Sequence, residues 1–264
     1  MRKKKKKLGT GTADFRRFLR VGLSRQHQTP VELVGGVVVY CDPKTWPVVP
    51  VRLEAVGLHL KKSLQLRDAE AAQLTKLLGH PSVTALGEVG LDLSEGTAVK
   101  LAQLESLGWV FSLAPARVPI ILHLKGAPVD PTGDEVHKLA LGIMEKREVS
   151  PQRRVHSFTG GSDLVDRWES RYPNVFFGLS LAVRGFSAKQ KAGVKALPPN
   201  KLLLESDSPY FPPPGARHGD PQYLYEVAAL VGEIRGCSPE EVIGQSVRNG
   251  CRLYGVRWLC PSRI

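Results

Sequence analysis

Seven short apolar runs, separated by amphipathic stretches, constrain the fold of this chain more than any other feature of its sequence. The first run, LVGGVVVYC, is rich in β-branched residues and apolar on both faces. Continuous apolar runs of this length are typical of strands buried on both sides of a parallel sheet. The runs span residues 33–41, 53–59, 83–91, 118–124, 154–158, 175–179 and 201–205.

The stretches between and after these runs carry apolar residues at helical spacing. In the second stretch, for example, Leu104, Leu107 and Phe111 recur on one face. Ser238 before Pro239 predicts the start of the last helix, and Ser187 predicts another cap. The predicted helices cover residues 69–78, 97–113, 133–145, 164–168, 187–197, 222–235 and 239–253.

Strands that alternate with helices indicate βα units around a parallel sheet. The chain has 264 residues, enough for one (β/α)₈ barrel of about 250 residues, and it shows no internal repeat or linker-like break. We therefore predict an α/β fold, a TIM-type (β/α) barrel that lacks its first strand. A doubly wound open sheet is the alternative.

The net charge of +12 is concentrated at the N-terminus. Residues 1–25 contain ten Lys or Arg and one Asp, so they supply +9, and the remaining chain has a nearly ordinary surface charge. Residues 1–30 are predicted to be a basic, disordered leader, with nuclear targeting or polyanion binding by residues 2–7 as the alternative. The basic pI is thus weak support for a nucleic-acid-binding body.

The sequence predicts an intracellular protein, in the nucleus or the cytoplasm. Its four cysteines form no CxxC pair and no recognisable metal spacing, which is typical of reduced thiols. The N-terminus lacks the apolar stretch of a secretory signal, and no apolar run approaches the ~20 residues that a membrane span requires. We expect no membrane association, and no stable protein partner can be inferred.

Acidic and imidazole side chains gather where four of the predicted strands end. Glu88, His123, His156 and Asp207 lie at the ends of the third, fourth, fifth and seventh runs. The carboxyl ends of the strands of a parallel barrel meet at one mouth, so these side chains are predicted to share a site. Such a set can hold Zn²⁺, Mn²⁺ or a similar ion, which activates water for hydrolysis. Taken singly, each histidine could also be a hydrogen-bonded core or surface residue, and each acid could be a helix cap or a solvated side chain.

The same residues carry a family resemblance. The segments ALGEVGLD (85–92), PIILHLKGA (119–127), RVHSFTGG (154–161) and LLLESDSPYFPP (202–213) resemble, in order and spacing, the signature blocks of the TatD-like metal-dependent deoxyribonucleases. Two further blocks of the family are resembled by AVGLHLKKS (55–63) and PEEVIGQSVRNGCRLYGV (239–256). The CDP triplet at 41–43 resembles the triplet that follows the second strand in animal relatives. The resemblance implies a hydrolase barrel over residues 31–258, followed by a tail at 259–264.

The resemblance also implies a divalent metal centre of one or two ions, Mg²⁺ in the first place and Mn²⁺ or Zn²⁺ otherwise. It implies that Glu88 bridges two ions and that His123 and His156 bind one of them. Asp207 is implied to bind the other ion and to handle protons, so that Asp207 and Glu88 are the catalytic residues. Glu205 is implied to support the ligands from behind.

The implied reaction is hydrolysis of phosphodiester bonds in DNA from a strand end, by a metal-activated water. Lys125 stands where the family usually carries Arg and is predicted to meet a phosphate as a point charge. His59 is predicted to contact the substrate or support the site. A solvated side chain for Lys125 and core packing for His59 are the alternatives.

One departure from the family pattern sets the alternatives. The family's first strand ends in a His-x-His pair that supplies two ligands, and this sequence contains no His-x-His. We consider an altered or incomplete start the leading explanation. The second explanation is a one-metal hydrolase. The third is a catalytically impaired relative that acts as a nucleic-acid or protein binding module. An enzyme acting on an amide or lactone is a further alternative by fold analogy.

Overall fold

The computed structural model describes residues 35–50, 53–59, 68–94, 96, 98–146 and 152–255. These residues form one parallel sheet in which each strand pairs with the next along the chain, without a crossover to a distant strand. The strands are β1 (Val38–Tyr40), β2 (Glu54–Val56), β3 (Val83–Asp92), β4 (Ile120–Lys125), β5 (Arg153–His156), β6 (Val175–Leu179) and β7 (Leu202–Leu204).

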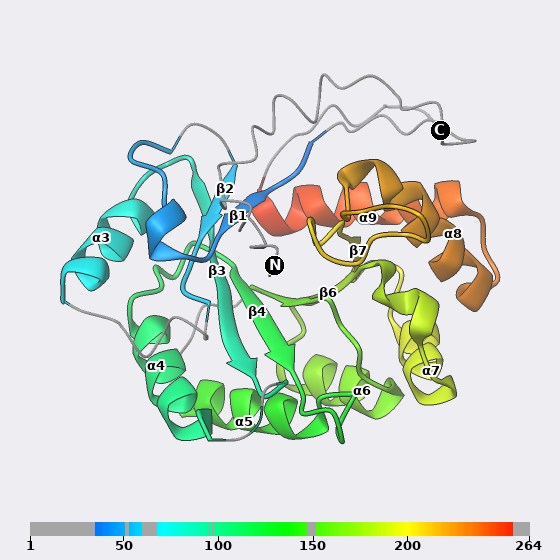
Figure 1. Ribbon diagram of the computed structural model, residues 1–264, viewed down its shortest axis with the longest axis horizontal. Coiled ribbons are helices and arrows are strands. Elements are labelled where there is room, and N and C mark those ends of the chain that lie inside the picture. The colour runs from blue at the N-terminus through cyan, green and yellow to red at the C-terminus, as the bar shows by residue number, and fades with distance from the viewer. Residues whose placement is uncertain are drawn as a thin grey trace, which may run out of the picture.

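Helices alternate with the strands and follow one another around the curled sheet (Figure 1). They are α3 (Asp68–Leu78), α4 (Lys100–Ser112), α5 (Asp134–Glu145), α6 (Ser162–Arg171), α7 (Ala188–Ala196), α8 (Leu224–Arg235) and α9 (Pro239–Tyr254). Short 3₁₀ turns lie at Pro43–Thr45, Leu181–Gly185 and Pro221–Tyr223.

The strand order confirms the prediction of a (β/α) barrel-type fold. A doubly wound sheet reverses its strand order at a switch point, whereas the order here is strictly sequential. Within the described residues, no pairing closes the sheet between β7 and β1. The predicted leader (1–30) and tail (259–264) lie outside the described residues, so those predictions remain untested.

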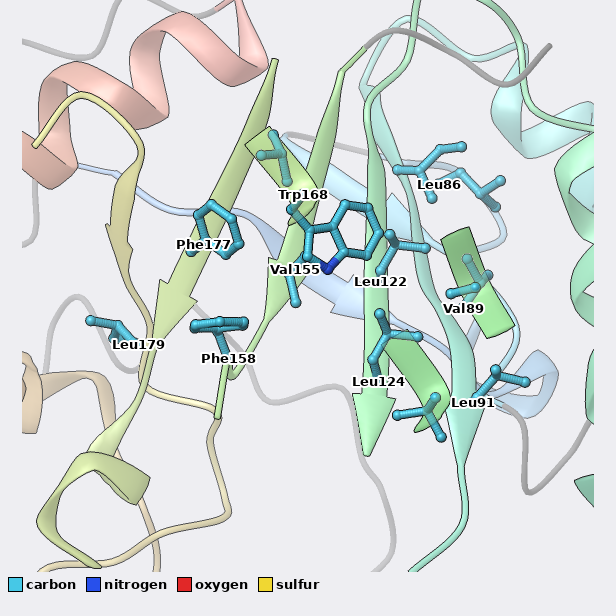
Figure 2. Close-up of a cluster of buried hydrophobic side chains, with 14 of the residues drawn as sticks. Leu86, Val89, Leu91, Leu122, Leu124, Val155, Phe158, Trp168, Phe177 and Leu179 are labelled. Atoms are coloured by element: carbon cyan, nitrogen blue, oxygen red, sulfur yellow. The ribbon is translucent and has the colours of Figure 1, made fainter. Parts of the chain in front are cut away.

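The core lies between the sheet and its surrounding helices. Leu122 and Leu124 of β4 are buried in this layer together with Trp168 of α6 (Figure 2). Successive side chains of a strand point to opposite faces. His123, between these two leucines, therefore points to the other face of the sheet. The same alternation separates Val155 from His156 on β5 and Leu91 from Asp92 on β3.

Two predicted helix starts have the expected caps. The hydroxyl of Ser187 accepts from the backbone N–H of Gln190, whose side chain accepts in return from Ser187, forming a capping box. Ser238 caps α9 by accepting from the N–H of Glu241 at 3.1 Å. None of the helices in the described chain has the length and apolar composition needed to cross a bilayer.

Candidate metal centre

The four predicted ligands lie together at the carboxyl ends of their strands. Oε2 of Glu88 is 3.7 Å from Nδ1 of His123, and its Oε1 is 3.5 Å from Nε2 of His156. Asp207, three residues beyond β7, places Oδ1 3.4 Å from the same Nε2 of His156. Residues separated by more than one hundred positions in the sequence thus meet around one point.

The donor set fits a divalent cation. One ligand atom each of Glu88, His123 and His156 lies within 4.8 Å of the other two. The side chains are 14%, 18% and 6% exposed, so they are largely withdrawn from water but not fully enclosed. A carboxylate and two imidazoles are ligands that Zn²⁺, Mn²⁺ and related ions accept.

Electrostatics keep the carboxylate of Glu88 ionised. Burial acts to raise the pKa of Glu88, but the charge of His156 and the contact with His123 outweigh it and lower that pKa to about 2. Burial acts to lower the pKa of His123, but Asp92 and Glu88 outweigh it and raise that pKa to about 9. These acidic neighbours thus favour a positive charge on the ring of His123, and a cation bound by that ring would take the place of its proton.

Glu205 lies behind His156. Its Oε2 is 3.1 Å from Nδ1 of His156 and forms an ion pair with Arg154, and its Oε1 accepts from the N–H of Ser157. Gly178 of β6 leaves room for this carboxylate, because a Cβ there would come within 2.4 Å of Oε2. With Nδ1 held by Glu205, Nε2 of His156 faces Glu88 and Asp207.

Two residues at the site have left-handed backbone conformations. Ser157, after β5, has φ 42°, and Asp207 has φ 48°. Such conformations cost about 1–3 kcal/mol for residues other than glycine and cluster at functional sites. In Ser157 the conformation accompanies the N–H that points to Glu205, and in Asp207 it accompanies the carboxylate beside His156.

The two predicted substrate-contacting residues differ in position. The ring of His59, after β2, lies 5.0 Å from the ring of His123, so His59 adjoins the cluster. Lys125 ends β4 with its side chain exposed, and we find no contact between that side chain and the cluster among the described residues. A role for either residue toward substrate remains a prediction.

The sequence interpretation missed Asp92. This residue ends β3, four positions after Glu88, and its carboxylate is 3.5 Å from Nε2 of His123. Its side chain is 4% exposed. The available signal was its position at the end of an apolar run that already carried one candidate ligand.

A profile of the family described as "TatD related DNase" matches residues 50–255. The chain belongs to this family. The match spans strands β2 to β7 and so includes every residue of the cluster. This confirms the family resemblance inferred from the signature blocks.

Curated relatives are about a quarter identical to this chain over the residues that align. A metal-dependent hydrolase of Bacillus subtilis, YabD, is 27% identical over 208 residues, which cover 76% of this chain and 77% of YabD. The 3′-5′ ssDNA/RNA exonuclease TatD of Erwinia billingiae is 26% identical over 212 residues, covering 75% and 76%.

Solved structures have the same fold. The TatD homologue YjjV of Escherichia coli superposes with a TM-score of 0.65 at 24% identity, covering 77% of each chain. An amidohydrolase of Saccharomyces cerevisiae superposes with a TM-score of 0.59 at 16% identity, covering 76% of this chain and 80% of the yeast protein. Metal-dependent hydrolysis is thus the chemistry of the family to which the chain belongs.

Proposed function

We propose that this protein is a metal-dependent nuclease that hydrolyses phosphodiester bonds of DNA inward from a strand end. The observation that carries the proposal is the cluster of Glu88, His123, His156 and Asp207 at the carboxyl ends of the strands in a TatD-related DNase. Relatives named as 3′-5′ ssDNA/RNA exonucleases favour a single-stranded substrate attacked from its 3′ end.

Glu88, His123 and His156 would hold the cation, with Asp207 beside His156. A divalent ion bound there supplies a Lewis acid that lowers the pKa of a coordinated water and neutralises phosphoryl charge. Mg²⁺ is the first candidate from the family resemblance, whereas the two imidazoles suit Zn²⁺ and Mn²⁺ better than Mg²⁺. Both oxygens of Glu88 face histidines of this one set, which supports at least one ion.

The protein's own groups would position the substrate and move the proton. The carboxylate of Asp207 would take the proton from the attacking water, and Glu205 would keep the ring of His156 fixed. His59 adjoins the cluster and would contact the nucleotide, and Lys125 would meet a phosphate as a point charge. Each of these roles depends on the cluster holding a cation.

The test is cleavage of a short 5′-labelled single-stranded oligonucleotide with Mg²⁺, Mn²⁺ or Zn²⁺. We expect a ladder of products shortened from the 3′ end, and a loss of at least about 10²-fold in rate for the double variant Glu88→Gln/Asp207→Asn. Glu105→Gln, an exposed change on α4, is the matched control and should leave the rate unchanged. Equal cleavage by the double variant would refute the proposal.

A second candidate function is a binding module without catalysis. The observation that favours it is the sequence itself, which contains no His-x-His pair. This function predicts that the protein binds the same oligonucleotide in the presence of a chelator and leaves it uncut with all three metals. Turnover above the level of the double variant excludes this candidate.

A further inference from the structure

We propose that Asp92 is a positioning residue that holds the imidazole of His123 with Nδ1 directed at the metal position. This inference rests on the proposed metal-dependent function. The ring of His123 lies between two carboxylates, with Nδ1 3.7 Å from Oε2 of Glu88 and Nε2 3.5 Å from Oδ2 of Asp92. The Nδ1 side faces Glu88, whose other oxygen contacts His156.

Asp92 is itself fixed on both its carboxylate and its backbone. Its Oδ1 accepts from the N–H of Ser94 at 2.9 Å and from the hydroxyl of Ser94 at 2.5 Å. Gln103, a fully buried glutamine of α4, accepts from the N–H of Asp92 and donates to its C=O, both at 3.0 Å. The carboxylate is therefore held by its own loop, and the backbone that carries it is held by a helix outside the sheet.

The register of β3 and β4 places the imidazole between the two acids. Gly90, midway between Glu88 and Asp92, is the residue that pairs with His123. A Cβ on Gly90 would lie 1.9 Å from the carbonyl oxygen of His123, and the residue has φ 153°, so only glycine permits this approach of the two strands. The ring of His123 is thus brought within reach of both carboxylates.

A carboxylate at one nitrogen of a histidine determines what the other nitrogen can do. It accepts the ring N–H, fixes the tautomer and leaves the lone pair of the opposite nitrogen for a metal. Asp92 would do this at Nε2 of His123, as Glu205 would at Nδ1 of His156. The two histidines then present opposite nitrogens, Nδ1 and Nε2, to the same carboxylate of Glu88.

The competing role for Asp92 is direct ligation. His59, Asp92 and His123 also offer ligand atoms within 4.8 Å of one another, so direct ligation would use this second set. In that case His123 would bind through Nε2 instead of Nδ1. The coordinating nitrogen of His123 therefore separates the two roles.

The experiment titrates the chelator-stripped full chain with Zn²⁺ alone by calorimetry. We expect Asp92→Asn to bind Zn²⁺ about 10- to 100-fold more weakly than the wild type. Asp220→Asn is the matched control, because Asp220 accepts the same kind of bond, from the N–H of Gln222 at 2.9 Å. No ion pair joins Asp220 to a histidine in the part of the chain that the structure describes, so its change should stay within about twofold.

Nitrogen-15 NMR of the Zn²⁺-loaded chain supplies the second readout. We expect Nδ1 of His123 bound to metal and a proton on Nε2 whose exchange with water accelerates in Asp92→Asn. If Asp92→Asn does not fold, Ser94→Ala removes the hydroxyl bond to the carboxylate and should weaken Zn²⁺ binding by severalfold.

Each remaining result decides between the proposals. Metal bound through Nε2 of His123, or unchanged Zn²⁺ affinity in Asp92→Asn, overturns the positioning role and leaves the proposed function intact. A wild-type chain that binds no Zn²⁺, Mn²⁺ or Mg²⁺ overturns both.

Discussion

The buried histidine of α5 should make the protein sensitive to mild acid. His137 is fully buried, and its Nδ1 accepts from Nε1 of Trp168 at 2.9 Å. The rings of His137 and Phe158 also meet in a T-shaped arrangement, with 5.8 Å between centroids. A proton on Nδ1 would place two donors against each other, so this histidine is held in its neutral form.

The magnitude follows from the pKa. Burial, opposed by the charges of Asp134 and Asp130, lowers the pKa of His137 from 6.5 to about 4. Below pH 6.5 the unfolded chain binds a proton that the folded chain does not, so the free energy of unfolding falls as the pH decreases toward 4. A difference of about 2.5 pKa units corresponds to about 3 kcal/mol, of which about 2 kcal/mol is lost between pH 7 and pH 5.

The assay is urea unfolding, followed by tryptophan fluorescence with a chelator present so that bound metal does not contribute. His137→Gln is the comparison, because its side chain retains an acceptor for Trp168 and does not titrate. Other groups titrate in both proteins, so the difference between the two pH profiles isolates His137. Wild type should lose about 2 kcal/mol more than the variant between pH 7 and pH 5. Parallel profiles would refute the reasoning.

NMR gives the same prediction an independent measurement. The ring of His137 in the folded wild type should remain neutral down to about pH 4, whereas an exposed histidine becomes protonated near pH 6.5. A folded-state titration near pH 6.5 would contradict the burial argument even if His137→Gln does not fold.

Three further experiments test the surroundings of the site and of β7. Gly90→Ala should lower the free energy of unfolding in urea by more than about 2 kcal/mol, because the added Cβ would clash with the backbone of His123. Gly142→Ala in α5 is the control: its Cβ meets open space, so the change should be neutral or stabilising. Asn249→Leu should lower the free energy of unfolding by about 2–4 kcal/mol in the same assay, because the buried amide of Asn249 donates to two backbone carbonyls near the start of β7. Burial and the charge of Glu88 raise the pKa of Cys41 to about 12. With a chelator present, its thiol should be alkylated far more slowly at pH 8 than in the unfolded protein, as measured by peptide mass spectrometry.

The fold could be predicted because strands of a parallel sheet are buried on both faces. Each of the seven apolar runs overlaps one strand of the structure. The boundaries were predicted less closely. Within the apolar run 201–205 the strand covers only Leu202–Leu204, and the helix predicted at 164–168 spans Ser162–Arg171 in the structure. In that helix only Leu164, Val165 and Trp168 are buried, so the apolar pattern ends before the backbone hydrogen bonds do.

The meeting of the four candidate ligands could also be predicted, since it depends only on strand direction. The carboxyl ends of β3, β4 and β5 lie at one edge, and adjacent pairing brings His123 opposite His156. The position of Lys125 could not be predicted in the same way. Two residues after His123 it is on the same face by alternation, but β4 ends there and the long side chain is exposed to solvent.

The sequence did not indicate a site role for Asp92 because an ordinary turn already accounts for an aspartate at this position. An aspartate at a strand end that accepts from the N–H two residues later is a common turn, and Asp92 does make that bond with Ser94. Its contact with Nε2 of His123 exists only because Gly90 pairs with that histidine, and a sequence does not state strand register. The choice of coordinating nitrogen is thus a tertiary property. Residue types can predict a candidate cation site, but under our proposal the nitrogen that would bind the ion depends on the carboxylate at the opposite side of the ring.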